Sequence, residues 1–366
     1  MALKFWAPLP FFHGDTTRPW EDILAEQLDI AQAAEDLGFE GVVIPENHFQ
    51  NYITNPSALA AAAIVAARTT RLKIHPGVFV LPYYHPLLVA SWFGMLDGLA
   101  PGRVSFGVAR GGARLGFDRL GVPYEESVER YEEALEIIQR AWVEDDLSWE
   151  GKYYSFPKST ISTKSKRPLD LWVASQSTEG IKRVANAGLN LETQANYGNF
   201  EPIGDIDALL ETYERAVDES GKPRGEVMVM RHVWLGDTEE QALEYWDDLV
   251  HHADHYMTIV QGGRENMDLT TQEARLGRRI DGAPVNDFIE RGVVQVVKVP
   301  RSNENLYETV NDPILTTADR MIERFKHHEK IGIDHVILHQ SWGQPNDAVL
   351  KNMEKMSKEV FPAFAD

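Results

Sequence analysis

The sequence predicts a single α/β domain whose parallel strands close into a (β/α)8 barrel. Strand-like and helix-like segments alternate along the 366 residues, which is typical of parallel α/β folds. Eight such strands precede helices, and this number favours closure into a barrel. A doubly wound open sheet is the main alternative. It is disfavoured because no Gly-x-Gly-x-x-Gly fingerprint follows the first strand, whereas Gly107, Gly111 and Gly112 follow the fourth.

The predicted strands are short runs of apolar, often β-branched residues. They cover 3–9, 41–45, 72–81, 104–109, 169–174, 189–194, 227–235 and 335–339. The predicted helices have apolar residues at helical spacing, and Gly38 and Gly188 stand where glycines commonly end helices. They cover 20–37, 56–68, 86–99, 125–143, 178–187, 206–220, 238–257, 317–331 and 347–361.

Two segments depart from this alternation. Residues 147–163 follow a helix and are predicted to form a hairpin or an extended arm over the barrel. Residues 258–312, after the seventh strand, are rich in Gly, Arg, Asn and Asp and have weak helical periodicity. A long irregular segment inside a compact domain is typical of a functional lid or of disorder. We therefore predict one TIM-barrel domain over 1–366 with a lid-like insertion at 258–312.

The composition excludes several classes of function. The formal net charge is −20, from 56 acidic and 36 basic residues, so nucleic acid and anionic membranes are not expected as partners. The absence of cysteine excludes disulfides, thiolate metal sites and cysteine nucleophiles. The nearly uncharged stretch 77–96 contains Pro82 and Pro86, which favours a buried strand, a turn and a buried helix over a membrane span. No signal peptide is evident, and we expect a cytoplasmic protein.

Chemistry in such barrels lies where strands end and the following loops begin. This rule selects 8–13, 46–49, 81–85, 109–114, 175–178, 194–197, 231–234 and 339–342. The hydroxyls of Ser177 and Thr178, at a helix start, are suited to bind a phosphate, and simple helix capping is the structural alternative. Arg110 is suited to grip the same phosphate or to pair with a surface acid. Together these features make a phosphate site and structural roles equally good interpretations.

Glu46, Asn47 and His48 bring a carboxylate, an amide and an imidazole together after the second strand. An imidazole titrates near neutral pH, so His48 is suited to act as an acid or a base. A histidine that is hydrogen-bonded within the barrel mouth for purely structural reasons is an equally good interpretation. These three residues are therefore candidate catalytic residues, and their pattern alone assigns no step of a reaction to any of them.

Aromatic residues gather at the predicted mouth, among them Phe79, Tyr83 and Trp342. They are suited to line a pocket for a flat ring and an apolar substrate, although barrel cores also contain aromatics. His251 and His255 are four residues apart on a predicted helix, but the glutamate of the zinc-protease pattern is missing and the pair does not follow a strand. We therefore expect no metal.

Several longer motifs occur in order along nearly the whole chain. Leu-Pro-x-x-His-Pro begins at Leu81, and Gly-Arg-Val-x-Phe-Gly-Val-x-Arg-Gly ends at Gly111. Glu-x-Leu-Gly-Phe occupies 35–39, Gly-x-Tyr-Tyr-x-Phe occupies 151–156, and Val-Phe-Pro occupies 360–362. Together these motifs resemble the bacterial luciferase-like flavin monooxygenases, and the segment between Leu81 and Gly111 is the most specific part of the resemblance.

The resemblance implies a TIM barrel, usually dimeric, that uses reduced FMN from a separate NAD(P)H:flavin reductase. With O2, such an enzyme inserts one oxygen atom into a small, partly apolar organic substrate. The resemblance places the flavin ring near His48 and Ala109, and makes 258–312 the lid that excludes water. It places the FMN phosphate on Arg110 and on the loop that carries Gln176, Ser177 and Thr178, and makes Gly111 a further cofactor-binding residue.

One position departs from the family pattern. Many members have Glu-His-His after the second strand, and here the middle position is Asn47. An asparagine still forms hydrogen bonds but does not transfer a proton at neutral pH. The variant sequence resembles the non-catalytic subunit of the luciferase heterodimer, so a partner subunit without a working flavin is one alternative. Because Arg110 and the phosphate-loop hydroxyls are present, we favour an active enzyme.

Two further alternatives stay open. The deazaflavin-dependent branch of the same superfamily transfers hydride without oxygen. A barrel hydrolase or isomerase is disfavoured, since no strand end supplies paired carboxylates or metal ligands. Binding of FMN separates a flavin enzyme from a hydrolase, and dependence on oxygen separates a monooxygenase from a hydride-transfer enzyme.

Overall fold

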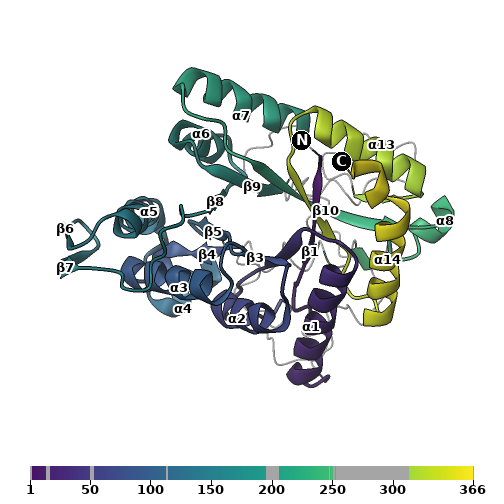
Figure 1. Cartoon of the computed structure of the whole chain (residues 1–366), viewed down its shortest axis with the longest axis horizontal. Coiled ribbons are helices and arrows are strands. Elements are labelled where there is room, and N and C mark those ends of the chain that lie inside the picture. Colours follow the sequence, from purple (N-terminus) through teal and green to yellow (C-terminus); the bar gives the residue numbers. More distant parts are fainter. Residues whose placement is uncertain are drawn as a thin grey trace.

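Eight parallel strands form the wall of a barrel in the computed structural model (Figure 1). The structure describes residues 2–13, 17–49, 53–112, 114–194, 206–246, 248–249, 252 and 313–365. The wall strands, in chain order, are β1 (Lys4–Pro8), β2 (Gly41–Ile44), β3 (Lys73–Pro76) with β4 (Phe79–Val80), β5 (Phe106–Ala109), β8 (Leu171–Ala174), β9 (Asn190–Gln194), β10 (Val227–Leu235) and β12 (His335–His339). The predicted α/β barrel is confirmed.

The barrel closes between the third and fourth wall strands. Hydrogen-bonded neighbours follow the order β3-β2-β1-β12-β10-β9-β8-β5-β4. A parallel bridge pairs Ile74 of β3 with Val104, just before β5. The Ile74 N–H donates to the Arg103 carbonyl at 2.8 Å, and the Ser105 N–H donates to the Ile74 carbonyl at 3.1 Å. The two ends of the sheet are thereby joined.

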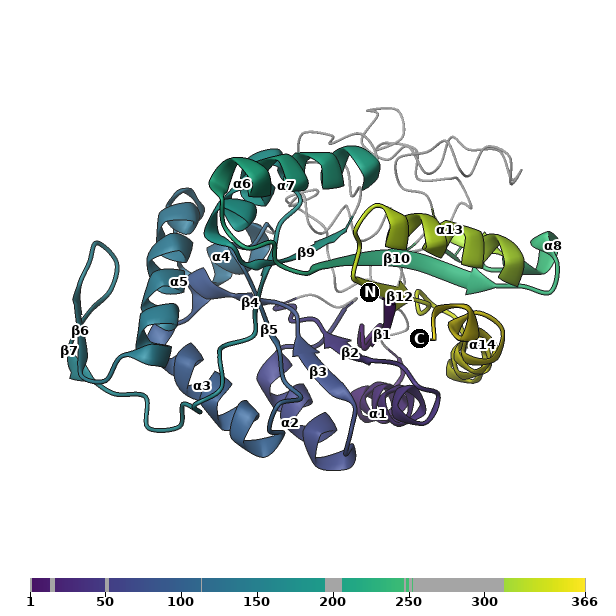
Figure 2. The ribbon, with the colours of Figure 1, turned by 45° about the horizontal axis from the view of Figure 1, so that its top comes forward.

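Helices surround the wall, and the predicted helices reappear with small shifts of their ends (Figure 2). They are α1 (Trp20–Asp36), α2 (Ala58–Arg68), α3 (Pro86–Leu99), α5 (Ser127–Val143), α6 (Thr178–Ala187), α7 (Ile206–Ser220), α13 (Ala318–Lys330) and α14 (Asn346–Glu359). The predicted helix 238–257 begins as α8 (Glu239–Ala242), and a turn at 243–245 interrupts it. Short 3-10 turns are η1 (Leu81–Tyr83), η2 (Tyr124–Glu126) and η4 (Phe361–Phe364).

The structure corrects three details of the prediction. The predicted strand 72–81 is divided into β3 and β4 around Gly77, where a Cβ atom would lie 2.6 Å from the His75 ring. A helix that was not predicted, α4 (Arg114–Leu120), follows β5; Gly116 within it weakens the helical signal. The third correction is an added strand, β11 (Ile314–Thr316), which is only three residues long and pairs with β10.

The segment after α5 forms the predicted hairpin. β6 (Leu147–Glu150) pairs antiparallel with β7 (Ser155–Ser159), and the pair projects from the side of the barrel (Figure 2). Glu133 of α5 holds its base: the Trp149 ring N–H donates to this carboxylate at 2.9 Å, as does the Tyr153 N–H at 3.0 Å. The hairpin is therefore anchored to α5 rather than laid over the barrel mouth.

Large side chains fill the lower part of the barrel interior. Trp6, Val43, Trp172, Met228 and Ile337 form one buried cluster there. A second, larger apolar core lies between the strands and the surrounding helices. Because side chains alternate between the two sides of a strand, successive residues feed these two cores in turn. The hollow space that remains lies at the carboxyl ends of the strands.

Some predictions fall on residues that the structure does not describe. The lid-like insertion 258–312 lies outside the described residues, as do His251 and His255. In the described part of the chain, no helix is long and apolar enough to cross a membrane. The uncharged stretch 77–96 forms β4, η1 and most of α3, as its two prolines suggested.

Two glycine-to-alanine substitutions in helices are expected to change the free energy of unfolding in opposite directions. Gly188 ends α6 with φ of 67°, a left-handed conformation, so Gly188→Ala is expected to lower the free energy of unfolding by about 1 kcal/mol. Gly98 lies within α3, and a Cβ added there would meet no atom of another segment within 4 Å, so Gly98→Ala is expected to raise it by about 0.5–1 kcal/mol. Urea-induced unfolding measures both. Equal shifts of the same sign would contradict the backbone explanation.

Candidate active site

A cavity of about 480 Å³ opens at the carboxyl ends of the wall strands. Its lining comes from the loops after several strands, as expected for this fold. Much of the wall is apolar and small, with Gly77, Ala109 and Ala174 facing a common space. The polar residues of the lining are Glu46, Asn47, His48, Tyr83, Arg110, Tyr131, Glu132, Ser175, Gln176, Ser177, Arg183, Glu192, Thr193, Gln194, His252 and His339.

One side of the cavity has the character of an anion site. Ser177 caps α6, and its Oγ accepts a hydrogen bond from the Gly180 N–H at 3.2 Å. A Cβ atom on Gly180 would lie 2.0 Å from the Ser175 hydroxyl, so only glycine lets that hydroxyl pack against the helix start. Helix starts carry unpaired N–H groups and a partial positive charge. The serines and the helix start therefore present donors to the cavity.

Arg110 contributes a positive charge to the same cavity. Its Nη1 donates to Ser127 Oγ at 3.2 Å and to the Tyr124 hydroxyl at 3.5 Å. Among the described residues, no carboxylate lies within ion-pair distance of this half-buried guanidinium. Its charge is thus available to an anion that enters the cavity. The sequence left an ion pair between Arg110 and a surface acid as the alternative, and the described residues contain no such ion pair.

Glu46, His48 and Tyr84 form a hydrogen-bonded group on another part of the wall. His48 Nε2 lies 2.9 Å from Glu46 Oε1 and 3.1 Å from the Tyr84 hydroxyl, and that hydroxyl donates to Glu46 Oε1. The other oxygen, Glu46 Oε2, accepts the Ala58 N–H at 3.1 Å, at the start of α2. Within the described residues, His48 Nδ1 has no protein partner. Glu46 thereby fixes the ring and leaves Nδ1 free to exchange a proton.

Two tyrosines beside this group are held in the protonated form. Burial, with the charge of Glu46, raises the pKa of Tyr83 to about 12. Burial and the hydrogen bond to Glu46 likewise raise the pKa of Tyr84. Both side chains therefore remain neutral hydrogen-bond donors across the physiological range of pH. The sequence showed Tyr84 only as one aromatic residue near the mouth, and its bond to Glu46 depends on a turn that brings η1 against the loop after β2.

Polar side chains also come from within the strands β3 and β9. His75 is fully buried and its Nε2 lies 3.1 Å from Glu192 Oε2, while Nδ1 lies 2.8 Å from Ser105 Oγ. The Thr193 hydroxyl, also in the lining, is buried without a protein partner. Sequence reasoning missed Glu192 and Thr193 because it looked beyond the strand ends. A carboxylate inside a strand that is otherwise buried was the available signal.

The structure brings most of the predicted site residues to one cavity and excludes others. Nine of them line it: Glu46, Asn47, His48, Tyr83, Ala109, Arg110, Gly111, Gln176 and Ser177. Thr178 starts α6 but is not part of the lining. Phe79 does not line the cavity, because it packs outward against Phe93 with ring centroids 5.3 Å apart. Trp342 is 1% exposed and packs against Trp234.

The chain is similar to known proteins over most of its length. A family model described as luciferase-like monooxygenase matches residues 3–299. The oxygenase component of flavin-dependent trigonelline monooxygenase from Acinetobacter baylyi is 23% identical over 348 residues, covering 93% of this chain and 90% of that protein. An F420-dependent glucose-6-phosphate dehydrogenase from Microbacterium testaceum is 24% identical over 327 residues, covering 86% and 87%.

A solved structure shares the fold over its full length. It is the oxygenating constituent of 3,6-diketocamphane monooxygenase from Pseudomonas putida in complex with FMN, with a TM-score of 0.75 and 18% sequence identity. The alignment covers 100% of this chain and 99% of that one. At this identity the likeness concerns the fold alone.

Proposed function

The chain belongs to the luciferase-like monooxygenase family, and on that premise we propose that it is an FMN-dependent monooxygenase. It takes reduced FMN from a separate NAD(P)H:flavin reductase and uses O2 to oxygenate a small, partly apolar organic substrate. The observation that carries this proposal is one cavity that combines an uncompensated Arg110 and the start of α6 with the Glu46–His48–Tyr84 group.

The anion side of the cavity fits the FMN phosphate. Arg110 and the Ser177 hydroxyl would hold the phosphate, with the N–H groups at the start of α6 as further donors. Gly111 adopts a φ of 86°, and a Cβ atom there would lie 2.6 Å from the Val80 side chain, so this turn of the lining requires glycine. Gln176 and Thr178 flank the same helix start. A phosphate dianion would neutralise the charge that Arg110 brings into the cavity.

The small residues of the wall fit a flat ring. Gly77, Ala109 and Ala174 line the cavity without bulky side chains, which leaves room for such a ring. The Thr193 hydroxyl, which lines the cavity and is buried without a protein partner, would be a further hydrogen-bonding group for a bound ligand. Bound in reduced form, FMN supplies the two electrons that activate O2. The protein then has to orient the ring, exclude water and manage one proton.

The Glu46–His48–Tyr84 group would manage that proton. Glu46 holds His48 through Nε2, so Nδ1 would deliver or accept a proton near the reacting atoms. Tyr84 stays protonated and fixes the Glu46 carboxylate. Asn47, also in the lining, would orient an oxygen by hydrogen bonding without transferring a proton. His48 is thus the proposed catalytic residue, with Glu46 and Tyr84 as positioning residues.

The remaining lining favours an apolar substrate. Side chains without polar atoms face the space beside the acid–base group: Pro8, Pro10, Val43, Ile53, Val80, Met230 and Ile337. Such a surface binds hydrocarbon and rejects strongly hydrated groups. Tyr83 adds a hydroxyl that stays protonated and is suited to bind a carbonyl oxygen.

An anaerobic titration tests the cofactor. Purified protein is titrated with reduced FMN without oxygen, and air-saturated buffer is then mixed in while the absorbance is followed. We expect binding of one FMN per chain and a return of the oxidised spectrum that is slower than for free reduced FMN, since the cavity shields the ring. Absence of binding contradicts the proposal and supports the non-catalytic partner subunit.

A second candidate function is hydride transfer with the deazaflavin F420. The likeness to an F420-dependent glucose-6-phosphate dehydrogenase over 86% of this chain favours it. The same titration repeated with reduced F420 discriminates the two. Preference for F420, with product formation that does not depend on oxygen, would replace the monooxygenase proposal.

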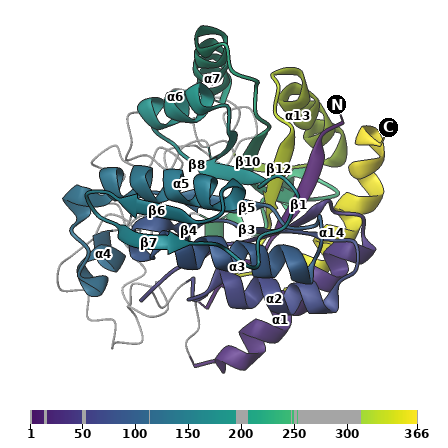
Figure 3. The same ribbon diagram turned by 60° about the vertical axis from the view of Figure 1, so that its left-hand side comes forward.

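We also propose that the chain forms a homodimer. α2 and α3 lie side by side on one flank of the barrel (Figure 3). Four large apolar side chains on this flank are at least 37% exposed: Ile64, Leu88, Met95 and Leu99. Apolar patches of this kind commonly mark protein interfaces. Sedimentation velocity is expected to give twice the chain mass of 41.3 kDa, and a monomer at micromolar concentration would contradict the proposal.

A further inference from the structure

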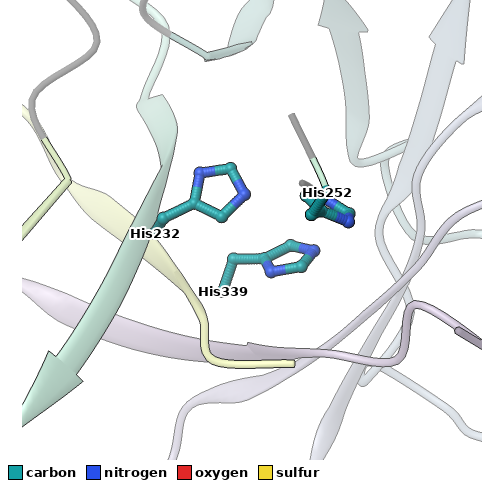
Figure 4. Close-up of side chains that lie close together, drawn as sticks. All are labelled: His232, His252 and His339. Atoms are coloured by element: carbon teal, nitrogen blue, oxygen red, sulfur yellow. The ribbon is translucent and has the colours of Figure 1, made fainter. Parts of the chain in front are cut away.

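Three histidines from distant parts of the chain converge beside the cavity. His232 belongs to β10, His339 is the last residue of β12, and His252 comes from the segment after α8. One ring nitrogen from each can be chosen so that all three lie within 4.8 Å of one another. Figure 4 shows the three rings gathered around a common space. Across the described residues, no other group of three potential ligands meets this criterion.

The barrel itself brings two of these rings together. β10 and β12 are parallel neighbours, and His232 stands opposite His339 in their register. Met230 and Ile337, two residues earlier on each strand, point into the barrel interior. Because strand side chains alternate with a period of two, His232 and His339 point inward as well. Their ring centroids are 4.7 Å apart, and His252 packs 5.6 Å from each of them.

The rings lie in the protein interior. His252 and His339 are only 3% and 5% exposed. In addition, His339 Nδ1 is buried without a protein hydrogen-bond partner, and a buried nitrogen lone pair of this kind loses the bonds that it forms in water.

We propose that His232, His252 and His339 bind one divalent transition-metal ion at the edge of the cavity, with zinc as the best match. Three imidazoles form the protein ligand set of a known class of four-coordinate zinc sites with an open position. Nitrogens at a zinc–nitrogen distance of about 2.0 Å in a tetrahedral site are roughly 3.3 Å apart. The ring nitrogens, which lie within 4.8 Å of one another, therefore need to approach by roughly 1.5 Å at most, within reach of small side-chain rotations.

The proposed metal site would open into the cavity. His252 and His339 are both part of the cavity lining, so a bound ion would have its remaining coordination position on that side. Water or an oxygen of a bound molecule would complete the shell. Imidazole ligands favour zinc, copper, nickel and cobalt over magnesium and calcium, which prefer oxygen. The alternative is a cluster of histidines that only pack against Trp342 and Phe12.

Metal binding is measured without flavin, so that its outcome is independent of the proposed monooxygenase function. The full chain is stripped with a chelator, returned to chelator-free buffer and titrated with ZnSO4 by calorimetry. We expect one ion per chain. Loss of an outer partner of a metal ligand typically lowers affinity about 10- to 100-fold, so His339→Gln, which removes a ligand, is expected to lower it at least about 100-fold. His232→Gln is expected to have a similar effect.

A matched control separates this site from surface binding. His327 of α13 is exposed and paired with Asp207 at 2.9 Å, so His327→Gln is expected to change zinc affinity less than twofold. Circular dichroism and thermal unfolding verify that each variant is folded. The wild-type protein is also loaded with Co2+, whose visible absorption is strong in four-coordinate and weak in six-coordinate sites. No binding by wild-type protein, unchanged affinity in folded His339→Gln, or a six-coordinate cobalt spectrum would overturn the proposal.

Discussion

Replacing His48 by alanine is expected to lower the rate of substrate oxygenation about 100- to 10,000-fold, the usual contribution of a positioned acid–base group. Affinity for reduced FMN should change little, because the His48 imidazole is not among the groups proposed to hold the FMN phosphate. Reduced FMN would still be consumed by oxygen, so hydrogen peroxide should replace the oxygenated product. The measurement compares the product formed and the peroxide released per reduced FMN consumed.

The matched control is His85→Ala. His85 is exposed, caps α3 by accepting the Leu87 N–H at 3.3 Å, and is not part of the cavity lining. It tests whether loss of any imidazole in this region reduces the rate. Tyr84→Phe provides a graded comparison, since it removes one hydrogen bond to Glu46 and leaves His48 in place. Full coupling in His48→Ala would return His48 to a structural role.

Replacing Arg110 by alanine is expected to weaken FMN binding by about 1.5–3 kcal/mol, the range for hydrogen bonds to a charged group. This corresponds to a dissociation constant about 10- to 150-fold higher. The effect should be larger for FMN than for riboflavin, which lacks the phosphate. Quenching of flavin fluorescence during titration measures both ligands. A ratio of FMN to riboflavin affinity that is the same in wild-type and variant protein would remove Arg110 from the phosphate site.

Arg114 offers a control of the same residue type. It begins α4, is 59% exposed and pairs with Glu125 at 3.1 Å. Arg114→Ala removes the same charge from the protein but not from the cavity, so FMN affinity is expected to remain within about twofold, as for exposed charges. Arg110→Lys keeps the charge and loses the planar donors, so it separates simple attraction from paired hydrogen bonds.

The barrel and much of its mouth could be predicted because both depend on local patterns. Short apolar runs reveal the wall strands, and helical spacing reveals the helices around them. A strand ends where the following loop begins, and this point can be placed from the sequence. Glu46, His48, Arg110 and Ser177 could therefore be assigned to the mouth without knowledge of their contacts. Phe79 and Trp342 were also predicted to lie at the mouth, but they do not line the cavity. In each case the direction of a single side chain decides whether it faces the cavity or the outer core, and Phe79 faces Phe93 of α3.

The histidine cluster could not be predicted for a different reason. The strand-end rule selected the segments 231–234 and 339–342, which contain His232 and His339. Their proximity depends on the register between β10 and β12, strands that are far apart in sequence. A shift of that register by one residue would turn one ring away from the other. His252 adds a third segment, which the sequence showed only as part of a histidine-rich helix.

The pairing of β1 with β12 has a consequence for how the protein is made. β1 leaves the ribosome before the other wall strands, yet one of its edges has no neighbour until His339 has emerged. Until then the nascent chain presents an unpaired strand edge, the kind of surface that chaperones shield and that promotes aggregation. The cavity is incomplete over the same interval, since His339 belongs to its wall. A ligand of this cavity therefore stabilises the barrel only after β12 has been made, and gives no help to the nascent chain before that point.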